Sequence, residues 1–243
     1  MRIGDEALDD SDSTVESKAA VAGGSILIAD DHPLFRGALK QVINNAFAGT
    51  AIYEAADIPH VQQTLSQHAD IDLLLLDLHM PGAVGFSALS YVVGNYPRCS
   101  TIIISANTHP ETVRRALDFG ASGFLSKSAP IEDIEQAIVG VRAGQVVAPL
   151  LPESTQRGVD LASLDVSAAV ARLTPQQFRV ASMLVEGLLN KQIAFELAVT
   201  EATVKAHMTE IFKKLGVHSR TQAVLVLHSL SLDSPSELSS PPS

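Results

Sequence analysis

Short apolar runs alternate with amphipathic stretches over residues 25–143. Most of the runs lack polar alternation, which is typical of parallel strands that helices cover on both faces. Between them, apolar residues recur at helical spacing behind Pro33, Pro110 and Pro130. Five strand–helix units predict an α/β domain over residues 24–143 with a five-stranded parallel sheet. We expect its strands at residues 25–30, 51–55, 73–76, 101–105 and 123–125.

The pattern changes after residue 143. Residues 144–168 are mixed in character and contain prolines, which predicts a linker with some helical content. Residues 169–231 follow helical spacing throughout, so we expect a second, all-α domain of four short helices there. The acidic segment 1–23 and the polar, proline-rich segment 232–243 are predicted to be disordered tails.

Cap residues divide the second domain into its four helices. Thr174, Asn190, Thr200 and Ser219 are candidate starts, and Gly216 is a candidate end of the third helix. That third helix has two distinct faces. Its expected inner stripe is Val204, Met208, Ile211 and Leu215, and its expected outer face is Ala202, Lys205, Ala206, Thr209 and Lys213.

Charge is distributed unevenly along the 243 residues, whose net charge is −10. Residues 169–231 carry seven Lys and Arg against four Glu, a net charge of +3, so the remainder carries ten basic against 23 acidic residues, −13. This asymmetry indicates two domains with different partners, one of them anionic. A face of lysines and small side chains fits the major groove of DNA, although a solvated helix surface has the same pattern.

The amino-acid composition indicates the cellular compartment of the protein. The one cysteine, Cys99, excludes an intramolecular disulfide and a CxxC metal site, which fits a reducing compartment. No stretch approaches the roughly 20 apolar residues of a membrane span, and the acidic start is the reverse of a secretory signal. We therefore expect a cytoplasmic protein with no membrane contact.

Acidic residues end two of the predicted strands. Asp30 and Asp31 follow the first run and Asp77 follows the third, and ligands of a parallel sheet bind at such carboxyl ends. If the two strands are neighbours, the three carboxylates converge and require a hard cation such as Mg²⁺. Ser105 and Lys127 end the fourth and fifth runs. Together these groups are the parts needed to transfer a phosphoryl group to an aspartate, although Asp31 could instead cap a helix.

The motifs ADDH (29–32), LLLLDLHMPG (73–82), Ser105-Ala106, FGAS (119–122) and GFLSK (123–127) occur in this order. Through them residues 25–143 resemble the receiver domain of two-component response regulators, which has a flavodoxin-like fold. The resemblance implies that Asp77 accepts a phosphoryl group from a histidine kinase or phosphotransfer protein, and that Lys127 and Ser105 contact the phosphoryl oxygens. It implies that Asp30, Asp31, Asp77 and the backbone carbonyl of His79 hold Mg²⁺. Phe124 would be the aromatic side chain that reorients on activation, although an apolar strand also supplies such a residue simply to fill the core.

The second domain resembles the LuxR-type helix-turn-helix through LTPQQ, GLLNKQIA, VTEATVKAHMTEIFKKLGV and RTQA. With a receiver in front, the chain is similar to the NarL/FixJ family of transcriptional regulators, which implies promoter binding as a homodimer. The implied DNA-binding residues are Asn190, Lys191, Thr200, Ala202, Thr203, Lys205, Ala206, Thr209 and Lys213. Gln176-Gln177 and Leu189 depart from the family pattern, where Arg-Glu and Ser or Thr are usual, and we expect them to weaken helix caps or a phosphate contact.

Two alternative functions need weighing. Aspartate-nucleophile phosphohydrolases share the Asp, Ser, Lys and Mg²⁺, but they need a second acid where this chain has His79. We therefore expect a switch and not an enzyme. The second alternative is a DNA-binding regulator that ignores phosphorylation and uses its receiver only to dimerise. The presence of all the phosphorylation residues argues against it.

Overall fold

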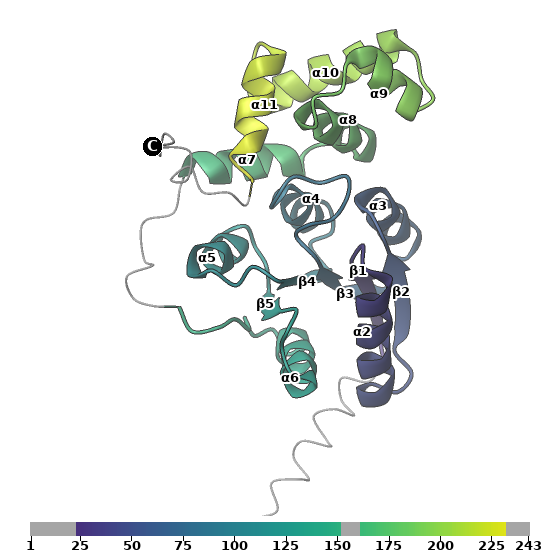
Figure 1. Ribbon diagram of the computed structural model, residues 1–243, viewed down its shortest axis with the longest axis vertical. Helices are drawn as coiled ribbons and strands as arrows, with labels where there is room; N and C mark the ends of the chain where they lie inside the picture. The colour runs from purple at the N-terminus through teal and green to yellow at the C-terminus, as the bar shows by residue number, and fades with distance from the viewer. Residues whose placement is uncertain (1–22, 152–160, 232–243) are drawn as a thin grey trace, which may run out of the picture.

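The computed structural model describes residues 23–151 and 161–231, arranged as an α/β domain followed by a helical domain (Figure 1). The strands are β1 (Ser25–Ala29), β2 (Ala51–Ala55), β3 (Ile71–Leu76), β4 (Ser100–Ser105) and β5 (Gly123–Ser126). The helices of the first domain are α2 (Pro33–Ala46), α3 (Ile58–Gln67), α4 (Ser87–Asn95), α5 (Pro110–Asp118) and α6 (Ile131–Arg142). Those of the second are α7 (Leu161–Ala171), α8 (Pro175–Val185), α9 (Asn190–Glu196), α10 (Glu201–Leu215) and α11 (Arg220–His228).

The five strands form one parallel sheet in the order β2-β1-β3-β4-β5, which confirms the predicted fold class of the first domain. β3 lies at the centre, between β1 and β4. The register pairs Ala29, the last residue of β1, with Leu76, the last residue of β3. The residues that follow these two strands therefore emerge side by side, which is the condition that the acidic residues require.

Helices cover both faces of the sheet, with α2 and α6 on one side and α3, α4 and α5 on the other (Figure 1). Because successive strand residues point to opposite faces, the leucines of β3 divide between two layers. Leu73 and Leu75 pack with α2 and α6, whereas Leu74 and Leu76 pack with α3, α4 and α5. The uninterrupted apolar run thus fills two cores at once.

Local capping defines the first two helices of the predicted helix-turn-helix region. The Thr174 hydroxyl accepts from the Gln177 N–H at 3.3 Å, and Gln177 Oε1 accepts from the Thr174 N–H at 3.1 Å, a complete capping box. Our expectation that Gln177 weakens this cap was wrong, because its amide oxygen accepts as a carboxylate does. Asn190 is the first residue of α9 and not its cap. The cap position is Leu189, which offers no side-chain acceptor.

The next two helices begin where the sequence predicts, and the first of them also ends at the predicted residue. The Thr200 hydroxyl caps α10 by accepting from the Thr203 N–H at 3.1 Å, and the Ser219 hydroxyl caps α11. α10 ends at Gly216, whose φ of 67° lies in the left-handed region that glycine adopts without strain. Val204 and Ile211 are fully buried, which confirms the inner stripe of this helix.

The segment predicted as a linker is ordered at both of its described ends. Val147 extends the sheet beside β5, because its carbonyl accepts from the Phe124 N–H at 2.8 Å and its N–H donates to the Ser122 carbonyl at 3.1 Å. Residues 161–168 belong to α7, so the described part of the second domain has five helices where the sequence predicted four. The sequence of α7, LASLDVSAAVA, shows no single apolar stripe because α4 and α10 contact it from different sides.

α7 also joins the two domains. Its Ser167 hydroxyl donates to the Ser90 hydroxyl at 2.8 Å, and its Ala171 carbonyl accepts from the Asn95 amide at 2.7 Å. Tyr91 of α4 and Phe178 of α8 lie with their ring centroids 5.0 Å apart. A single cluster of buried apolar side chains therefore runs from the sheet into the helical domain.

The tails predicted at 1–23 and 232–243 lie, apart from Gly23, outside the described residues, as does the linker segment 152–160. Across the described parts of the chain, every helix is too short or too polar to traverse a bilayer.

Gly94 permits the close contact between α4 and α7. Two glycine-to-alanine substitutions, which should change the free energy of unfolding in opposite directions, test this contact. A Cβ built on Gly94 would lie 2.2 Å from Cβ of Ala171, whereas one built on Gly37 in α2 would meet no atom within 4 Å. Replacing glycine by alanine inside a helix normally stabilises a protein by up to about 1 kcal/mol. Gly37→Ala should do so, but Gly94→Ala should destabilise by about 1–3 kcal/mol because it overpacks the contact.

The measurement is the free energy of unfolding from urea titrations. The double variant Gly94→Ala/Ala171→Gly should recover part of the loss, since it removes the opposing methyl group. Equal stabilisation by Gly37→Ala and Gly94→Ala would contradict the close approach of the two helices.

Candidate functional site

The sheet brings the predicted acidic residues together. The Asp77 N–H donates to the Ala29 carbonyl at 2.9 Å and the Asp30 N–H donates to the Ala55 carbonyl at 3.1 Å, so each acid continues the ladder of its strand. The side chains of Asp30 and Asp77 are 1% exposed, and that of Asp31 is 34% exposed. Their carboxylates meet at the carboxyl end of the sheet, where the sequence analysis placed them.

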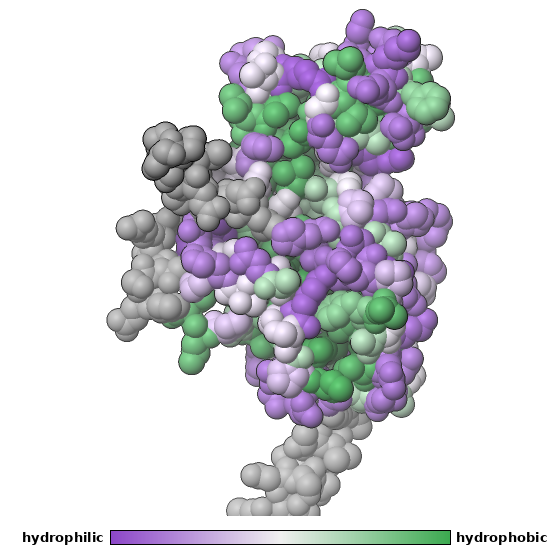
Figure 2. Space-filling model, in the orientation of Figure 1, coloured by the Kyte–Doolittle hydropathy of each residue, from purple (hydrophilic) through white to green (hydrophobic). Residues whose placement is uncertain are grey.

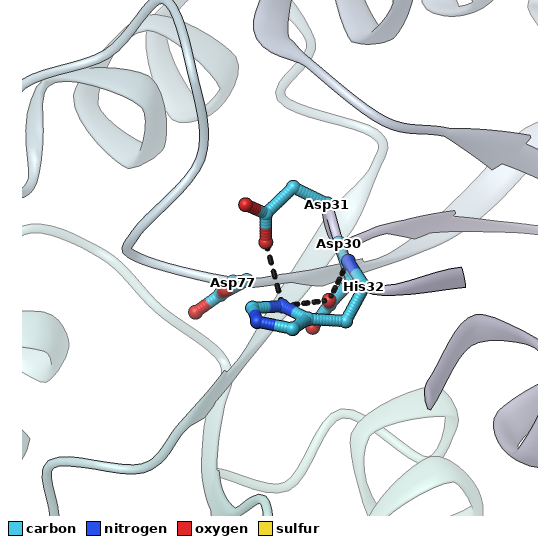
Figure 3. A group of neighbouring side chains, drawn as sticks. All are labelled: Asp30, Asp31, His32 and Asp77. Carbon is cyan, nitrogen blue, oxygen red and sulfur yellow. Dashed lines mark hydrogen bonds and ion pairs between the residues drawn. The ribbon is translucent and has the colours of Figure 1, made fainter. Parts of the chain in front are cut away.

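His32 is a member of this cluster that the sequence analysis missed (Figure 3). Its ring Nδ1 lies 2.7 Å from an Asp31 oxygen and 3.1 Å from an Asp30 oxygen, and its backbone N–H donates to Asp30 at 2.8 Å. The ring is 66% exposed, in keeping with a solvated residue beside a helix start. The sequence signal that could have placed His32 in the cluster is its position directly after two aspartates in the motif ADDH.

Ligand atoms from Asp30, Asp31, His32 and Asp77 all lie within 4.8 Å of one another, close enough to surround one ion. The three carboxylates offer hard oxygen donors, the kind that Mg²⁺ prefers. His79 comes from the same loop as Asp77: its backbone N–H donates to an Asp77 oxygen at 3.2 Å, and its ring Nδ1 lies 3.9 Å from that carboxylate. The donor set therefore fits a magnesium site.

Lys127 supplies the positive charge between the two buried acids. Its ammonium lies 2.7 Å from an Asp30 oxygen and 2.9 Å from an Asp77 oxygen. Burial lowers the pKa of Lys127, but its hydrogen bonds to Asp30 and Asp77 and their charges raise it by more, so the pKa lies above the ordinary value. Lys127 is therefore charged at neutral pH, and it balances part of the negative charge of the cluster.

The other two receiver residues named from the sequence lie deeper. Ser105 is fully buried at the end of β4, and its hydroxyl accepts from the Asn107 N–H at 3.1 Å. Its carbonyl accepts from the Lys127 N–H at 2.9 Å, which ties it to the strand that carries the lysine. Phe124 is 1% exposed within the apolar core of β5. Ser105 and Phe124 are thus close to the cluster in the fold, but their side chains face the interior.

A surface hollow opens beside the acids, and Asp77 is one of the residues that line it. Its rim is partly apolar, and Leu34 at the start of α2 is 91% exposed. Figure 2 shows hydrophobic surface gathered over the region of α2 and α6. The residues that line the hollow are His32, Leu34, Phe35, Ala38, Asp77, His79, Ala106 and Lys127.

The second candidate site is the outer face of α10. This face is exposed and consists of small and basic side chains. The exposed residues on it are Ala202, Lys205, Ala206, Thr209 and Lys213, as predicted. A helix with this face accessible has the geometry needed to enter a major groove.

Three of the other residues predicted to contact DNA have structural partners. Thr200 and Thr203 form the cap of α10, with their hydroxyls 2.9 Å apart. The Asn190 side-chain oxygen lies 3.5 Å from the Arg220 guanidinium of α11. Lys191 is exposed at the start of α9. In this structure the cap residues shape the helices.

Lys214, which adjoins Lys213, behaves differently from the other lysines of α10. Its ammonium donates to the Arg172 carbonyl at 2.6 Å and to Gln177 Oε1 at 2.7 Å. Lys214 therefore fastens α10 to the turn between α7 and α8. Of these two adjacent lysines, Lys213 is exposed on the outer face of α10, whereas Lys214 holds the helices together.

Family comparisons agree with the division into two domains. Residues 26–139 match the family model described as response regulator receiver domain. Residues 171–227 match that of bacterial regulatory proteins, luxR family.

Similar proteins extend over most of the chain. The glycerol metabolism activator of Pseudomonas putida is 40% identical over 205 residues, which cover 82% of this chain and 93% of that protein. The nitrate/nitrite response regulator protein NarL of Escherichia coli K12 is 34% identical over 209 residues, 84% of this chain and 94% of that protein. A solved structure of two RcsB dimers bound to two parallel DNAs has a TM-score of 0.50 at 24% identity, and covers 86% of this chain and 100% of that one. That likeness concerns the fold.

Because Lys127 pairs with two buried acids, its substitution should destabilise the protein far more than substitution of a lysine in an exposed ion pair. Lys127→Met leaves Asp30 and Asp77 buried without their counter-charge, so it should lower the free energy of unfolding by about 3–5 kcal/mol. The control is Lys40→Met, which breaks an exposed ion pair with Glu54 and should cost about 1 kcal/mol or less.

The pH dependence follows from the raised pKa of Lys127. The contribution of charged Lys127 to the free energy of unfolding is complete below the ordinary lysine pKa of about 10.4. It is lost only as pH rises through the higher pKa of Lys127 in the folded protein. Urea unfolding in metal-free buffer should therefore show that Lys127→Met lowers the free energy of unfolding by the same amount at about pH 7 and at about pH 9. Equal losses for the two variants would contradict the ion-pair interpretation.

Proposed function

Since this chain belongs to the NarL/FixJ family of response regulators, with a receiver domain and a LuxR-type DNA-binding domain, we propose that phosphorylation of Asp77 controls its binding to promoter DNA. The family consists of transcriptional regulators and not of enzymes. The observation that carries the proposal is the Asp77 carboxylate, buried at the end of β3 with the Lys127 ammonium 2.9 Å away.

The proposed chemistry is transfer of a phosphoryl group from a phosphohistidine of a partner kinase or phosphotransfer protein. An Asp77 oxygen attacks phosphorus, the N–P bond breaks, and the departing imidazole takes up a proton from solvent. The product is an acyl phosphate on Asp77. Lys127 already lies beside the nucleophile and would pair with the new phosphoryl oxygens.

Asp30, Asp31, Asp77 and the backbone carbonyl of His79 would hold Mg²⁺ at this site. The bound ion would neutralise charge on the phosphoryl oxygens during transfer. In the protein alone, the Lys127 ammonium partly fulfils this electrostatic role, and the His32 ring lies against Asp30 and Asp31. Ion binding would therefore change the partners of Asp30 and Asp31.

The partially apolar rim of the hollow supports a protein phosphodonor. Leu34 and Ala38 are exposed on α2 beside the charged site, and Phe35 lies beneath Lys127 with its ring centroid 5.2 Å from the ammonium. Exposed apolar side chains next to a reactive group are typical of protein contact surfaces. A kinase domain that presents its phosphohistidine to Asp77 would cover them.

In the proposed switch, the phosphoryl group draws the Ser105 hydroxyl and the Lys127 ammonium toward it. Ser105 is buried and bonded to Asn107, so engagement of its hydroxyl requires the loop after β4 to move. Phe124 lies three residues before Lys127 on β5 and would reorient with that loop. The two arrangements would form a two-state equilibrium that phosphorylation biases.

On the DNA side, α10 would insert its outer face into the major groove, with Lys205 and Lys213 meeting bases or phosphates. The local net charge of +3 is small, so one copy would bind weakly. A homodimer would present two such helices to half-sites about one helical turn, or a multiple of it, apart.

Phosphorylation of Asp77 is tested with acetyl phosphate and Mg²⁺. Wild-type protein should gain the mass of one phosphoryl group and bind its promoter more tightly, whereas Asp77→Asn should do neither. Asp72→Asn is the matched control, because Asp72 lies in the same strand but pairs with Arg142 at 2.9 Å instead of facing the cluster.

A promoter fragment for this assay comes from genome-wide mapping of bound DNA. If wild type takes up no phosphoryl group, the proposed switch is wrong. If it does so without any change in affinity, the phosphorylation-independent regulator is the correct function.

The two kinds of lysine on α10 give a separate test of DNA binding. Lys205→Ala should weaken promoter binding by about 1–3 kcal/mol, the value of one good contact to a base. Lys214→Ala, on the same helix, should leave affinity nearly unchanged because its ammonium is bonded within the protein. Fluorescence anisotropy titrations at fixed salt measure both. A larger loss for Lys214→Ala in a folded protein would argue against the proposed reading face.

A further inference from the structure

The peptide bond between Asp30 and Asp31 joins two of the three acids of the cluster. The Asp30 N–H continues the ladder by donating to the Ala55 carbonyl at 3.1 Å, but β1 itself ends at Ala29. Beyond that point the Asp30 carbonyl requires a donor from another element, because a buried carbonyl without a hydrogen bond is costly. The Arg36 guanidinium is this donor, and its Nη1 lies 2.6 Å from the carbonyl oxygen.

This hydrogen bond differs in kind from the side-chain contacts of the two acids. The Asp30 carboxylate accepts from the His32 N–H at 2.8 Å and pairs with the Lys127 ammonium at 2.7 Å. The Asp31 carboxylate lies 2.7 Å from the His32 ring (Figure 3). These contacts use carboxylate oxygens, which are the atoms that a bound cation would take. The bond from Arg36 uses a backbone carbonyl, so it can persist when a cation binds.

The hold on this carbonyl extends to both acids because a peptide group is planar. When Arg36 fixes the Asp30 carbonyl, it also fixes the direction of the Asp31 N–H and the position of the Asp31 Cα. The two carboxylates carry like charges and repel each other at short range. A fixed peptide plane limits how far they can turn apart, and their ligand atoms stay within 4.8 Å of each other.

Arg36 is itself oriented by a neighbouring strand. It lies near the start of α2, and its side chain is 15% exposed. Its Nε lies 3.5 Å from one oxygen of Glu54 in β2, and the other oxygen of Glu54 accepts from the Lys40 ammonium at 2.7 Å. One planar guanidinium thus meets a carboxylate of β2 and a carbonyl beyond β1, which a single ammonium could not do in the same geometry.

We propose that Arg36 is a positioning residue for the cation site: by holding the peptide between Asp30 and Asp31, it arranges their carboxylates around one divalent cation. Its role toward Mg²⁺ rests on the proposed function, whereas its hold on the peptide does not. Loss of a residue that orients metal ligands typically lowers metal affinity by about 10–100-fold. Arg36→Met should therefore weaken Mg²⁺ binding by about 10-fold or more.

The direction of this change separates positioning from a simple effect of charge. Arg36 carries a positive charge beside a site for a cation, so charge repulsion alone predicts that its loss tightens Mg²⁺ binding. Positioning predicts weaker binding. Lys40→Met is the matched control, because it removes a positive charge from the same group of ion pairs, yet its ammonium binds the Glu54 carboxylate instead of the backbone of the acids. It should leave Mg²⁺ affinity unchanged or slightly higher.

The experiment is a titration of the isotope-labelled full chain with magnesium chloride at constant ionic strength, followed by NMR spectra of the backbone amides. Arg36→Lys keeps the charge but replaces the planar group by a single point donor, so its Mg²⁺ affinity should lie between those of wild type and Arg36→Met. Circular dichroism confirms that each variant is folded.

Spectra of the metal-free proteins test the hold on the peptide separately. The Asp31 N–H belongs to the same peptide as the carbonyl that Arg36 contacts, so its signal reports on that hydrogen bond. Arg36→Met should shift or broaden the Asp31 and His32 amide signals, whereas Lys40→Met should leave them in place. Unchanged Asp31 and His32 signals in Arg36→Met would show that the peptide does not depend on Arg36.

The outcomes distinguish this inference from the proposed function. If wild type binds Mg²⁺ and folded Arg36→Met binds it equally or more tightly, the positioning role is wrong although the metal site stands. If wild type shows no saturable Mg²⁺ binding, the proposed metal site fails and the role of Arg36 toward it fails as well. The metal-free comparison of Arg36→Met with Lys40→Met then still decides whether Arg36 holds the peptide.

Discussion

Two carboxylates, those of Asp30 and Asp77, lie buried side by side at the carboxyl end of the sheet, and one ammonium lies between them. Burial of like charges is costly unless an opposite charge accompanies them. Lys127 meets this requirement from β5 although β4 separates its strand from β3. The order and register of the sheet must therefore be correct for the charges to balance.

Packing of apolar side chains connects the charged site to α10. One cluster of buried apolar side chains extends from β3 through α4 to α7, α8 and α10. At two places the domains touch through glycines, Gly85 against Leu230 and Gly94 against Ala171, because any side chain there would collide. The outer face of α10 stays exposed in this arrangement. Docking thus fixes the placement of the helical domain without covering this face of α10.

Much of this could be predicted from the sequence because the signals are local. The apolar runs, the proline starts and the caps Thr174, Thr200 and Ser219 each act within a few residues of one another. The acids and Lys127 could be placed at strand ends for the same reason. α7 was predicted only as some helical content within a linker, because contacts with both α4 and α10 remove the one-sided apolar stripe that marks a helix. The partners of His32 were missed because a ring beside a helix start is ordinarily solvated.

The sequence by itself determined the strands, most of the helices, the chemistry at the strand ends and the outward face of α10, since each depends on the spacing of residues along one element. Only the tertiary structure decided how the elements meet: that Lys127 bridges Asp30 and Asp77, that Lys214 turns inward while Lys213 does not, and that Arg115 reaches the end of α11. These contacts join residues 37 to 116 positions apart, and no local pattern encodes a partner at such separations.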